Sequence, residues 1–282
     1  MYATFSDWMT SPREVPDACS IFAIGDVHGC ADHLQALHAT IKQEISASTG
    51  LTSHVIHLGD YIDRGPDSLR TLELLSRGIG EAAEEIYLVG NHDQFLIELL
   101  NLDPEFDREF MINWYENGGI ATMKSLQVEG YGRLTDLGDF AELRDRTTAA
   151  LGPDLVEFLR SLKTTHQIGD YLFVHAGIDP CRELKEQDFS DLLLIREPFL
   201  SGVDNWPHSF CVVHGHSISA PAIHSHRIGV DAGCNAFGAL CALQLTPSGA
   251  RFIAVSEDSS AAWLDKLGEP AKSWRWSDAR SI

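Results

Sequence analysis

Three mainly apolar runs in the first third of the chain, at 21–24, 53–58 and 85–89, each end in glycine and a polar residue. Runs of this length that stop at a turn residue predict buried β-strands. Residues 32–45 carry leucine and isoleucine at helical spacing, and a second helical pattern starts after Pro66. Strand, loop and helix therefore alternate, which predicts parallel strands joined by crossover helices.

The middle of the chain lacks strand patterns and predicts a helical insertion. Its helices are expected at 94–100, 107–126, 136–149 and 154–162. Beyond Thr164 the pattern becomes that of β-strands. These are expected at 166–169, 171–174, 210–213, 222–230, 239–245 and 251–255, the first two as a hairpin.

Together these elements predict an α/β fold with one catalytic domain. We expect the domain to cover 17–256, with the helical insertion at about 94–162. Residues 257–282 are expected to form a C-terminal tail, in which Trp263, Trp274 and Trp276 indicate that some of the chain packs.

The composition limits the functions that the chain can have. Its 282 residues include 21 basic and 41 acidic side chains, which give a net charge of −20. A nucleic-acid surface needs a basic stripe and docking on anionic lipid needs basic clusters, so neither partner is expected. An acidic protein that handles phosphate must concentrate positive charge locally, and bound metal ions would do so.

Several features predict a cytoplasmic protein. The six cysteines form no Cys-x-x-Cys pair, as expected for reduced thiols rather than a disulfide framework. Residues 1–16 carry charges and lack the apolar core of a signal peptide. No run approaches the roughly 18 apolar residues of a membrane helix. Nothing in the sequence indicates a low pKa for Cys30 or Cys234, so no redox role is predicted for them.

Five segments place a side chain of a metal-binding type beside a glycine. Three follow the predicted parallel strands and two lie far downstream: Gly25-Asp26-Val27-His28-Gly29, Gly59-Asp60-Tyr61-Ile62-Asp63-Arg64-Gly65, Gly90-Asn91-His92-Asp93, Val174-His175-Ala176-Gly177 and His214-Gly215-His216. Ligands bind at the carboxyl ends of strands in open α/β sheets, and glycine lets the backbone approach them closely. We expect the five segments to meet at one site.

These segments supply ligands for two divalent ions. Asp26 and His28 share a loop and can bind one ion, Asp60 can bridge both ions, and His175 and His216 would complete the second. The full predicted ligand set is Asp26, His28, Asp60, Asn91, His175 and His216. Nitrogen and oxygen ligands without thiolate favour manganese, iron or zinc, of which manganese is expected.

Two ions about 3.5–4 Å apart can clamp a phosphoryl group and generate a hydroxide that attacks phosphorus. The leaving oxygen then needs a proton, for which His92 is the predicted general acid, oriented by Asp63. Arg64 lies next to Asp63 and can bind phosphate oxygens through two hydrogen bonds. Two neighbouring ions with these groups predict hydrolysis of a phosphoester.

The first three motifs have the order and spacing of the signatures GDxHG, GDxxDRG and GNHE, so the chain resembles the phosphoprotein phosphatase branch of the metallophosphoesterases. The resemblance covers about residues 21–245 and implies a β-sandwich of mixed sheets flanked by helices, two metal ions and no phosphoenzyme. It also implies that Arg196, in Leu194-Ile195-Arg196-Glu197-Pro198-Phe199, binds phosphate together with Arg64 and Asn91. Asp93 departs from the usual glutamate of the third motif.

The resemblance implies a manganese-dependent serine/threonine protein phosphatase of bacterial type. Two alternatives keep the chemistry: symmetrical hydrolysis of dinucleoside tetraphosphates, or a broad specificity that includes phosphotyrosine. A phosphate-binding module without activity is disfavoured because it needs no leaving-group acid such as His92, and the charge of −20 disfavours a nuclease.

Some residues have a second interpretation from the sequence alone. Arg196 can instead pair with Glu197 in a structural ion pair, and His92 can serve only to hold Asp63. His214 alternates with His216 along a predicted strand, so it is expected to point away from the ions. Asp231-Ala232-Gly233 resembles a late family segment near the site, but a turn explains it equally well.

Overall fold

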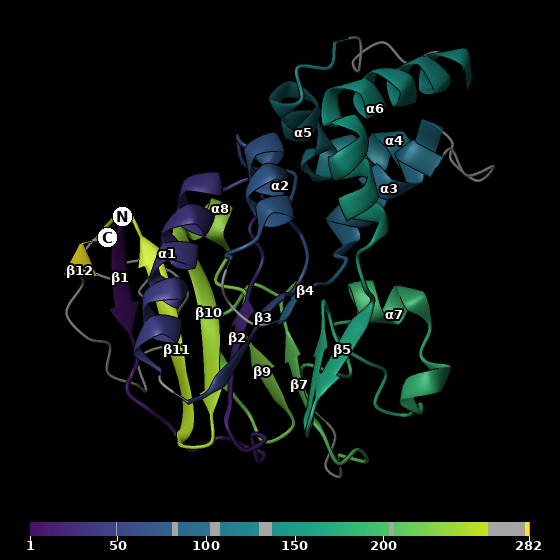
Figure 1. Cartoon of the computed structure of the whole chain (residues 1–282). Coiled ribbons are helices and arrows are strands. Elements are labelled where there is room, and N and C mark those ends of the chain that lie inside the picture. Colours follow the sequence, from purple (N-terminus) through teal and green to yellow (C-terminus); the bar gives the residue numbers. More distant parts are fainter. Residues whose placement is uncertain are drawn as a thin grey trace.

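Two mixed β-sheets that pack face to face form the centre of the molecule (Figure 1). The computed structural model describes residues 1–48, 50–80, 84–101, 108–129, 137–202, 206–258 and 280–281. The larger sheet has the strand order β12 (Arg280–Ser281), β1 (Tyr2–Phe5), β11 (Gly249–Ser256), β10 (Ala239–Thr246), β2 (Cys19–Ile24), β3 (Thr52–His57) and β4 (Glu84–Tyr87). The smaller sheet has the order β5 (Thr165–Ile168), β6 (Tyr171–Val174), β7 (Cys211–His214), β9 (Arg227–Gly229) and β8 (Ala222–Ile223). The predicted α/β fold with two mixed sheets is confirmed.

Parallel pairing in both sheets determines where the loops after the strands lie. In the larger sheet β2, β3 and β4 are parallel. The crossover helices α1 (Ala31–Ala47) and α2 (Ser68–Arg77) connect them, as the apolar pattern predicts. In the smaller sheet β6, β7 and β9 are also parallel. Parallel neighbours end at the same edge of a sheet, so each sheet presents three such loops together.

The sequence of β2 shows why these strands are nearly continuous apolar runs. Ile21 and Ala23 pack into the layer between the two sheets. Phe22 and Ile24 point to the other face, where they pack against the helices. A strand that is buried on both faces needs apolar residues at every position rather than at alternate ones.

Helices cover the outer face of each sheet. Helices α1 and α2 pack on the larger sheet, and α7 (Phe189–Leu194), which follows the 3-10 turn η2 (Leu184–Glu186), packs on the smaller one. The helical insertion contains α3 (Asn91–Asn101), α4 (Arg108–Trp114), the π-helical turn η1 (Tyr115–Gly119), α5 (Ile120–Ser125) and α6 (Leu137–Arg160). Figure 1 shows that α3 to α6 gather beyond one end of the sheets.

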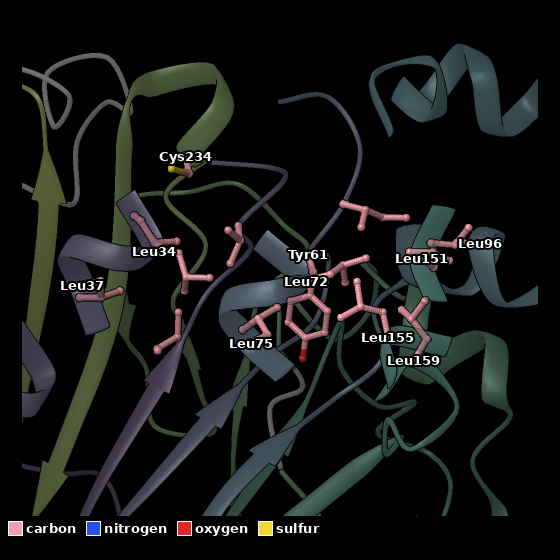
Figure 2. Close-up of a cluster of buried hydrophobic side chains, with 14 of the residues drawn as sticks. Leu34, Leu37, Tyr61, Leu72, Leu75, Leu96, Leu151, Leu155, Leu159 and Cys234 are labelled. Carbon is pink, nitrogen blue, oxygen red and sulfur yellow. The ribbon is translucent and has the colours of Figure 1, made fainter. Parts of the chain in front are cut away.

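Tyr61, in the second motif, joins the insertion to the larger sheet. Its buried ring lies among leucines of α1, α2, α3 and α6 (Figure 2), which are Leu34, Leu37, Leu72, Leu75, Leu96, Leu151, Leu155 and Leu159. Its hydroxyl donates a hydrogen bond to the carbonyl of Leu88 at 2.6 Å. The insertion is therefore packed directly against a motif loop.

Two helical predictions are changed by glycines. The helix expected at 107–126 is divided into α4, η1 and α5, because Gly118 has φ 114°. The helices expected at 136–149 and 154–162 are continuous in α6 except for a kink at Gly152, where φ is 73°.

The β prediction was wrong at 222–230, which is not one strand. The amide of His224 donates to the carbonyl of Arg227 at 2.8 Å, which closes a hairpin between β8 and β9. Strands β1 and β12 were not predicted and lie outside the range 17–256. The three tryptophans of the predicted tail lie outside the described residues.

Within the described ranges, every helix is too short or too polar to cross a lipid bilayer.

Leu243 of β10 is fully buried between the sheets and tests their packing. We expect Leu243→Ala to lower the free energy of unfolding by about 2–5 kcal/mol, because the cavity adds to the lost burial. The matched control Leu194→Ala, at a residue that is 53% exposed, should change it by no more than about 0.5 kcal/mol. Urea unfolding measures the free energy of unfolding of both variants. Equal losses in the two variants would contradict the packing of the two sheets.

Candidate metal centre

The predicted site residues lie where parallel strands of both sheets end. Asp26, Asp60 and Asn91 follow β2, β3 and β4, while His175 and His216 follow β6 and β7. Backbone hydrogen bonds join neighbouring loops: the amide of Gly215 donates to the carbonyl of His175 at 2.8 Å, and that of His28 to the carbonyl of Asp60 at 2.9 Å. The two sheets thus bring segments that are far apart in the chain to one place.

Asp60 is shared by two groups of metal-type donors. His28, Asp60 and His92 form one group, and Asp60, His175 and His216 form the other, with donor atoms inside each group within 4.8 Å of one another. Oδ2 of Asp60 lies 3.5 Å from Nε2 of His28, and Oδ1 lies 3.4 Å from Nε2 of His175. Each carboxylate oxygen therefore faces a different group, which is the geometry of a bridging ligand.

His175 shows that the second group fits a cation. Its Nδ1 lies 2.8 Å from the carbonyl of Leu58, so Nδ1 carries the proton, and Nε2 of the neutral ring has a lone pair. Nε2 faces Oδ1 of Asn91 at 3.0 Å and Oδ1 of Asp60 at 3.4 Å. All three atoms are acceptors in this arrangement. A positive ion among them would make the contacts favourable.

Asp26 lies outside both donor groups but beside the second. Its Oδ2 accepts the backbone N–H of His216 at 3.0 Å, and its carboxyl group is hydrogen-bonded to Asp231, which follows β9. Burial, followed by the charges of Asp231 and Asp60, raises the pKa of Asp26 well above its usual value. The segment around Asp231 therefore belongs to the site and is more than a turn.

The site concentrates buried negative charge. Burial is the main cause that raises the pKa of Asp231 to about 6, and it raises the pKa of Asp93 to about 8 together with the charge of Asp60. Burial also lowers the pKa of His216 to about 3, helped by neighbouring His175, so this imidazole stays neutral. Carboxylates of this kind are stable in their charged form when a cation lies among them.

Asp93 takes the place of the glutamate in the usual third motif, and its role is structural. Its carboxylate accepts the backbone N–H groups of Asp60 at 2.8 Å, Tyr61 at 2.9 Å and Gly90 at 2.9 Å. These hydrogen bonds fix the loop after β3 against the start of α3.

His92 and Asp63 form a buried pair beside the first group. Nδ1 of His92 lies 2.7 Å from Oδ2 of Asp63. Burial alone would lower the pKa of His92, but the charges of Asp60 and Asp63 outweigh it and raise this pKa. The imidazole is thus held in one orientation with its Nε2 toward the site.

Trp114 and Thr122 hold Asp63 and were not found from the sequence. Nε1 of Trp114 donates to Oδ2 of Asp63 at 2.8 Å, and the hydroxyl of Thr122 donates to Oδ1 at 2.5 Å. The π-helical turn η1 lies between them, and irregular turns of this type are frequent at functional sites. No local sequence signal connects either residue to Asp63, since the contacts join segments far apart in the chain.

Both predicted phosphate-binding arginines are exposed at the site. Nη1 of Arg64 lies 2.7 Å from Nε2 of His28, and Nη2 lies 2.8 Å from Nε2 of His92. Arg196 lies close enough to His216 that its charge also lowers the pKa of that residue, after burial and His175. Glu197 accepts hydrogen bonds from Ser201 rather than pairing with Arg196 in the described contacts.

The backbone is strained at the site. Seven non-glycine residues have positive φ in the described part of the chain, and five of them are predicted site residues: His28 (46°), Asp60 (53°), Asp63 (71°), Arg64 (65°) and His216 (60°). Each such residue costs about 1–3 kcal/mol and persists where the surroundings over-determine it. The loops are therefore shaped for the position of their side chains.

Gly59 and Gly90 show why the motifs contain glycine. Gly59 has φ 103°, and a Cβ there would lie 2.6 Å from the amide nitrogen of Gly90. A Cβ on Gly90 would lie 2.1 Å from Oδ1 of Asp60. The third motif therefore needs glycine so that its backbone can lie against the carboxylate of Asp60.

His214 confirms the alternation predicted for the end of β7. It is buried, its Nδ1 contacts the carbonyl of Gly215 at 3.0 Å, and it belongs to neither donor group around Asp60.

The fold and the position of Asp60 between two donor groups are those expected of a metallophosphoesterase, and a family match agrees. The profile of the calcineurin-like phosphoesterases matches residues 19–247, so the chain belongs to this family. Its members use a dinuclear centre of divalent ions. The part of the resemblance that is confirmed is this superfamily.

Named relatives are bacterial tetraphosphatases. A symmetrical bis(5'-nucleosyl)-tetraphosphatase of Methylococcus capsulatus is 30% identical over 161 residues, which cover 57% of this chain and 44% of that protein. Another symmetrical enzyme, of Janthinobacterium sp., is 24% identical over a match that covers 80% of this chain and 92% of that protein. The asymmetrical bis(5'-nucleosyl)-tetraphosphatase PrpE of Oceanobacillus iheyensis is 24% identical over a match that covers 75% of this chain and 82% of that protein. The match to the Methylococcus capsulatus protein therefore spans less than half of that protein's length.

One solved structure, named "Crystal structure of a putative diadenosine tetraphosphatase", has a TM-score of 0.54 to this chain. The sequence identity is 19%, and the match covers 85% of this chain and 94% of the other. At this sequence identity, the similarity supports the assignment of the fold alone.

Gly90→Ala tests the close approach to Asp60. We expect the variant to fold and to lose tight manganese binding, because the new Cβ must displace the carboxylate. Isothermal titration calorimetry measures the binding. The control Gly80→Ala, where a Cβ meets nothing within 4 Å, should bind as the natural protein does. Unchanged binding in Gly90→Ala would remove Asp60 from the metal site.

Proposed function

We propose that this protein is a metal-dependent hydrolase of dinucleoside polyphosphates that cuts dinucleoside tetraphosphates symmetrically. The family, the shared position of Asp60 between two donor groups and the names of the relatives support this substrate class. The observation that carries the hydrolase chemistry is the bridging geometry of Asp60 next to the His92–Asp63 pair. The serine/threonine phosphatase predicted from the motifs becomes the competing outcome of the test.

We assign the metal ligands as Asp26, His28, Asp60, Asn91, His175 and His216, with Asp60 as the bridge. His28 is prepared for this role, because its Nδ1 is 2.8 Å from the carbonyl of Ile62 and its Nε2 therefore carries the lone pair. Two divalent ions bound there supply Lewis acidity and an activated water nucleophile.

Arg64 has two mutually exclusive sets of partners. In the structure it donates to Nε2 of both His28 and His92. If Nε2 of His28 binds a cation, its lone pair can no longer accept a hydrogen bond from Arg64. If Nε2 of His92 is protonated, it has no lone pair to accept one either. Arg64 must then turn to other acceptors, and the oxygens of a bound polyphosphate fit its fork of donors. Arg196 and Asn91 complete the proposed phosphate contacts.

His92 is the proposed general acid. Nε2 of its ring would give a proton to the oxygen of the departing nucleoside diphosphate, while Nδ1 stays on Asp63. Trp114 and Thr122 support this step, because their hydrogen bonds favour the charged form of Asp63 and so favour a protonated His92.

The substrate class is tested by comparing kcat/KM with manganese for diadenosine tetraphosphate, phosphoserine, phosphothreonine and phosphotyrosine peptides, and an aryl phosphate. We expect the dinucleotide to be the best substrate and ADP to be its single nucleotide product. ATP with AMP would indicate asymmetrical cleavage instead. A phosphopeptide with the highest kcat/KM would replace the proposal by a protein phosphatase, and no hydrolysis of any substrate would exclude the hydrolase.

His92→Asn tests the general acid. We expect turnover of the dinucleotide to fall by about 10²–10⁴-fold with metal binding retained. The loss should be much smaller for nitrophenyl phosphate, whose leaving group needs no proton. The control His224→Asn, at an exposed residue of the β8–β9 turn, should be unaffected. An equal loss for both substrates would refute the acid role.

A further inference from the structure

A third group of metal-type donors lies outside the site around Asp60. It consists of Cys30, His33 and Cys234, whose donor atoms lie within 4.8 Å of one another. Cys30 precedes α1, His33 lies in the first turn of α1, and Cys234 opens the short helix α8 (Cys234–Phe237). The three side chains thus come from two segments at opposite ends of the chain.

The two thiols face each other in a protected place. Cys234 is only 2% exposed and lies in the cluster of Leu34 and Leu37 (Figure 2), while Cys30 and His33 are partly buried. The thiol of Cys234 donates a hydrogen bond to the sulfur of Cys30. Neither sulfur is exposed as a surface thiol would be, yet the partial exposure of Cys30 leaves an entry path.

His33 makes a hydrogen bond of the kind that metal-binding histidines make. Its Nε2 lies 3.3 Å from the carbonyl of Gly238, the residue that ends α8, so Nε2 is the donor and Nδ1 has the lone pair. Ligand histidines commonly donate their other ring N–H to a backbone carbonyl, which fixes tautomer and orientation. Helix α8 thereby supplies one ligand and orients another.

We propose that Cys30, His33 and Cys234 bind one thiophilic divalent ion, such as zinc, at a site separate from the Asp60 centre. Two thiolates and one imidazole leave one position of a tetrahedron open. Zinc holds sulfur at about 2.3 Å and nitrogen at about 2.0–2.1 Å in sites of this kind. Each thiol releases its proton to solvent as its sulfur binds the ion.

The chemistry of the two sites separates their ions. The Asp60 centre offers oxygen and nitrogen donors, which suit manganese, whereas thiolates select zinc and other soft ions. The cysteine site also touches the loops of the first centre, since Cys30 follows the segment of His28 and Cys234 follows that of Asp231. An ion there would join the loop that carries Asp26 and His28 to the loop that carries Asp231.

Cadmium is the probe for this site, because cadmium bound to thiolate has an ultraviolet charge-transfer absorption that oxygen and nitrogen ligands do not give. We expect titration of the reduced natural protein to produce this absorption with a one-equivalent end point. Cys30→Ser and Cys234→Ser should each lower the affinity by more than about 100-fold, beyond the 10–100-fold that outer contacts cost. His33→Ala should also lower the affinity for cadmium. The control Cys181→Ser, at an exposed cysteine, should titrate as the natural protein does.

A second measurement uses the natural protein alone and does not depend on whether a variant folds. Cadmium should protect Cys30 from alkylation by iodoacetamide, as mapped by mass spectrometry, while the exposed Cys181 continues to react. Absence of the absorption, its persistence in Cys30→Ser, or equal alkylation of Cys30 with and without cadmium would overturn the proposal. These readouts are independent of any hydrolytic activity.

Discussion

The carboxylate of Asp60 is the contact on which the rest of the site depends. Each of its oxygens faces a different pair of imidazoles, and Oδ1 also accepts the backbone N–H of His92 at 2.9 Å. The loop that carries it is strained and is fixed through Asp93. One side chain therefore couples loops from both sheets, and a displacement of Asp60 would disturb both donor groups at once.

The arrangement of the sheets explains how such a contact forms. Six strands, three parallel ones in each sheet, end beside the site, and each contributes buried side chains to the layer between the sheets, which leaves little freedom for the loops that follow. The rigid layer between the sheets provides the precision, and the polar residues outside it provide the chemistry. This division suits a family in which one scaffold serves several phosphoesters.

Much of this could be predicted from the sequence, because the strands and the motifs are local signals. Runs such as 21–24 identify buried strands, and glycines beside Asp60 and Asn91 mark ligand loops. What could not be predicted depends on distant contacts: Trp114 and Thr122 reach Asp63 across the helical insertion, and β1 joins the sheet by pairing with β11 near the other end of the described chain. The superfamily was recognisable from the motifs, but they describe the phosphate site and contain little about the group attached to the phosphate.

The hydrogen bonds from Trp114 and Thr122 to Asp63 have a consequence for the way this protein can diversify. The helical insertion cannot be removed without consequence for the site, because two of its side chains hold Asp63, the partner of the proposed proton donor His92. Any replacement of the insertion would have to supply new hydrogen-bond donors for Asp63. Engineering of substrate range is therefore best confined to loops that leave α4, η1 and α5 unchanged.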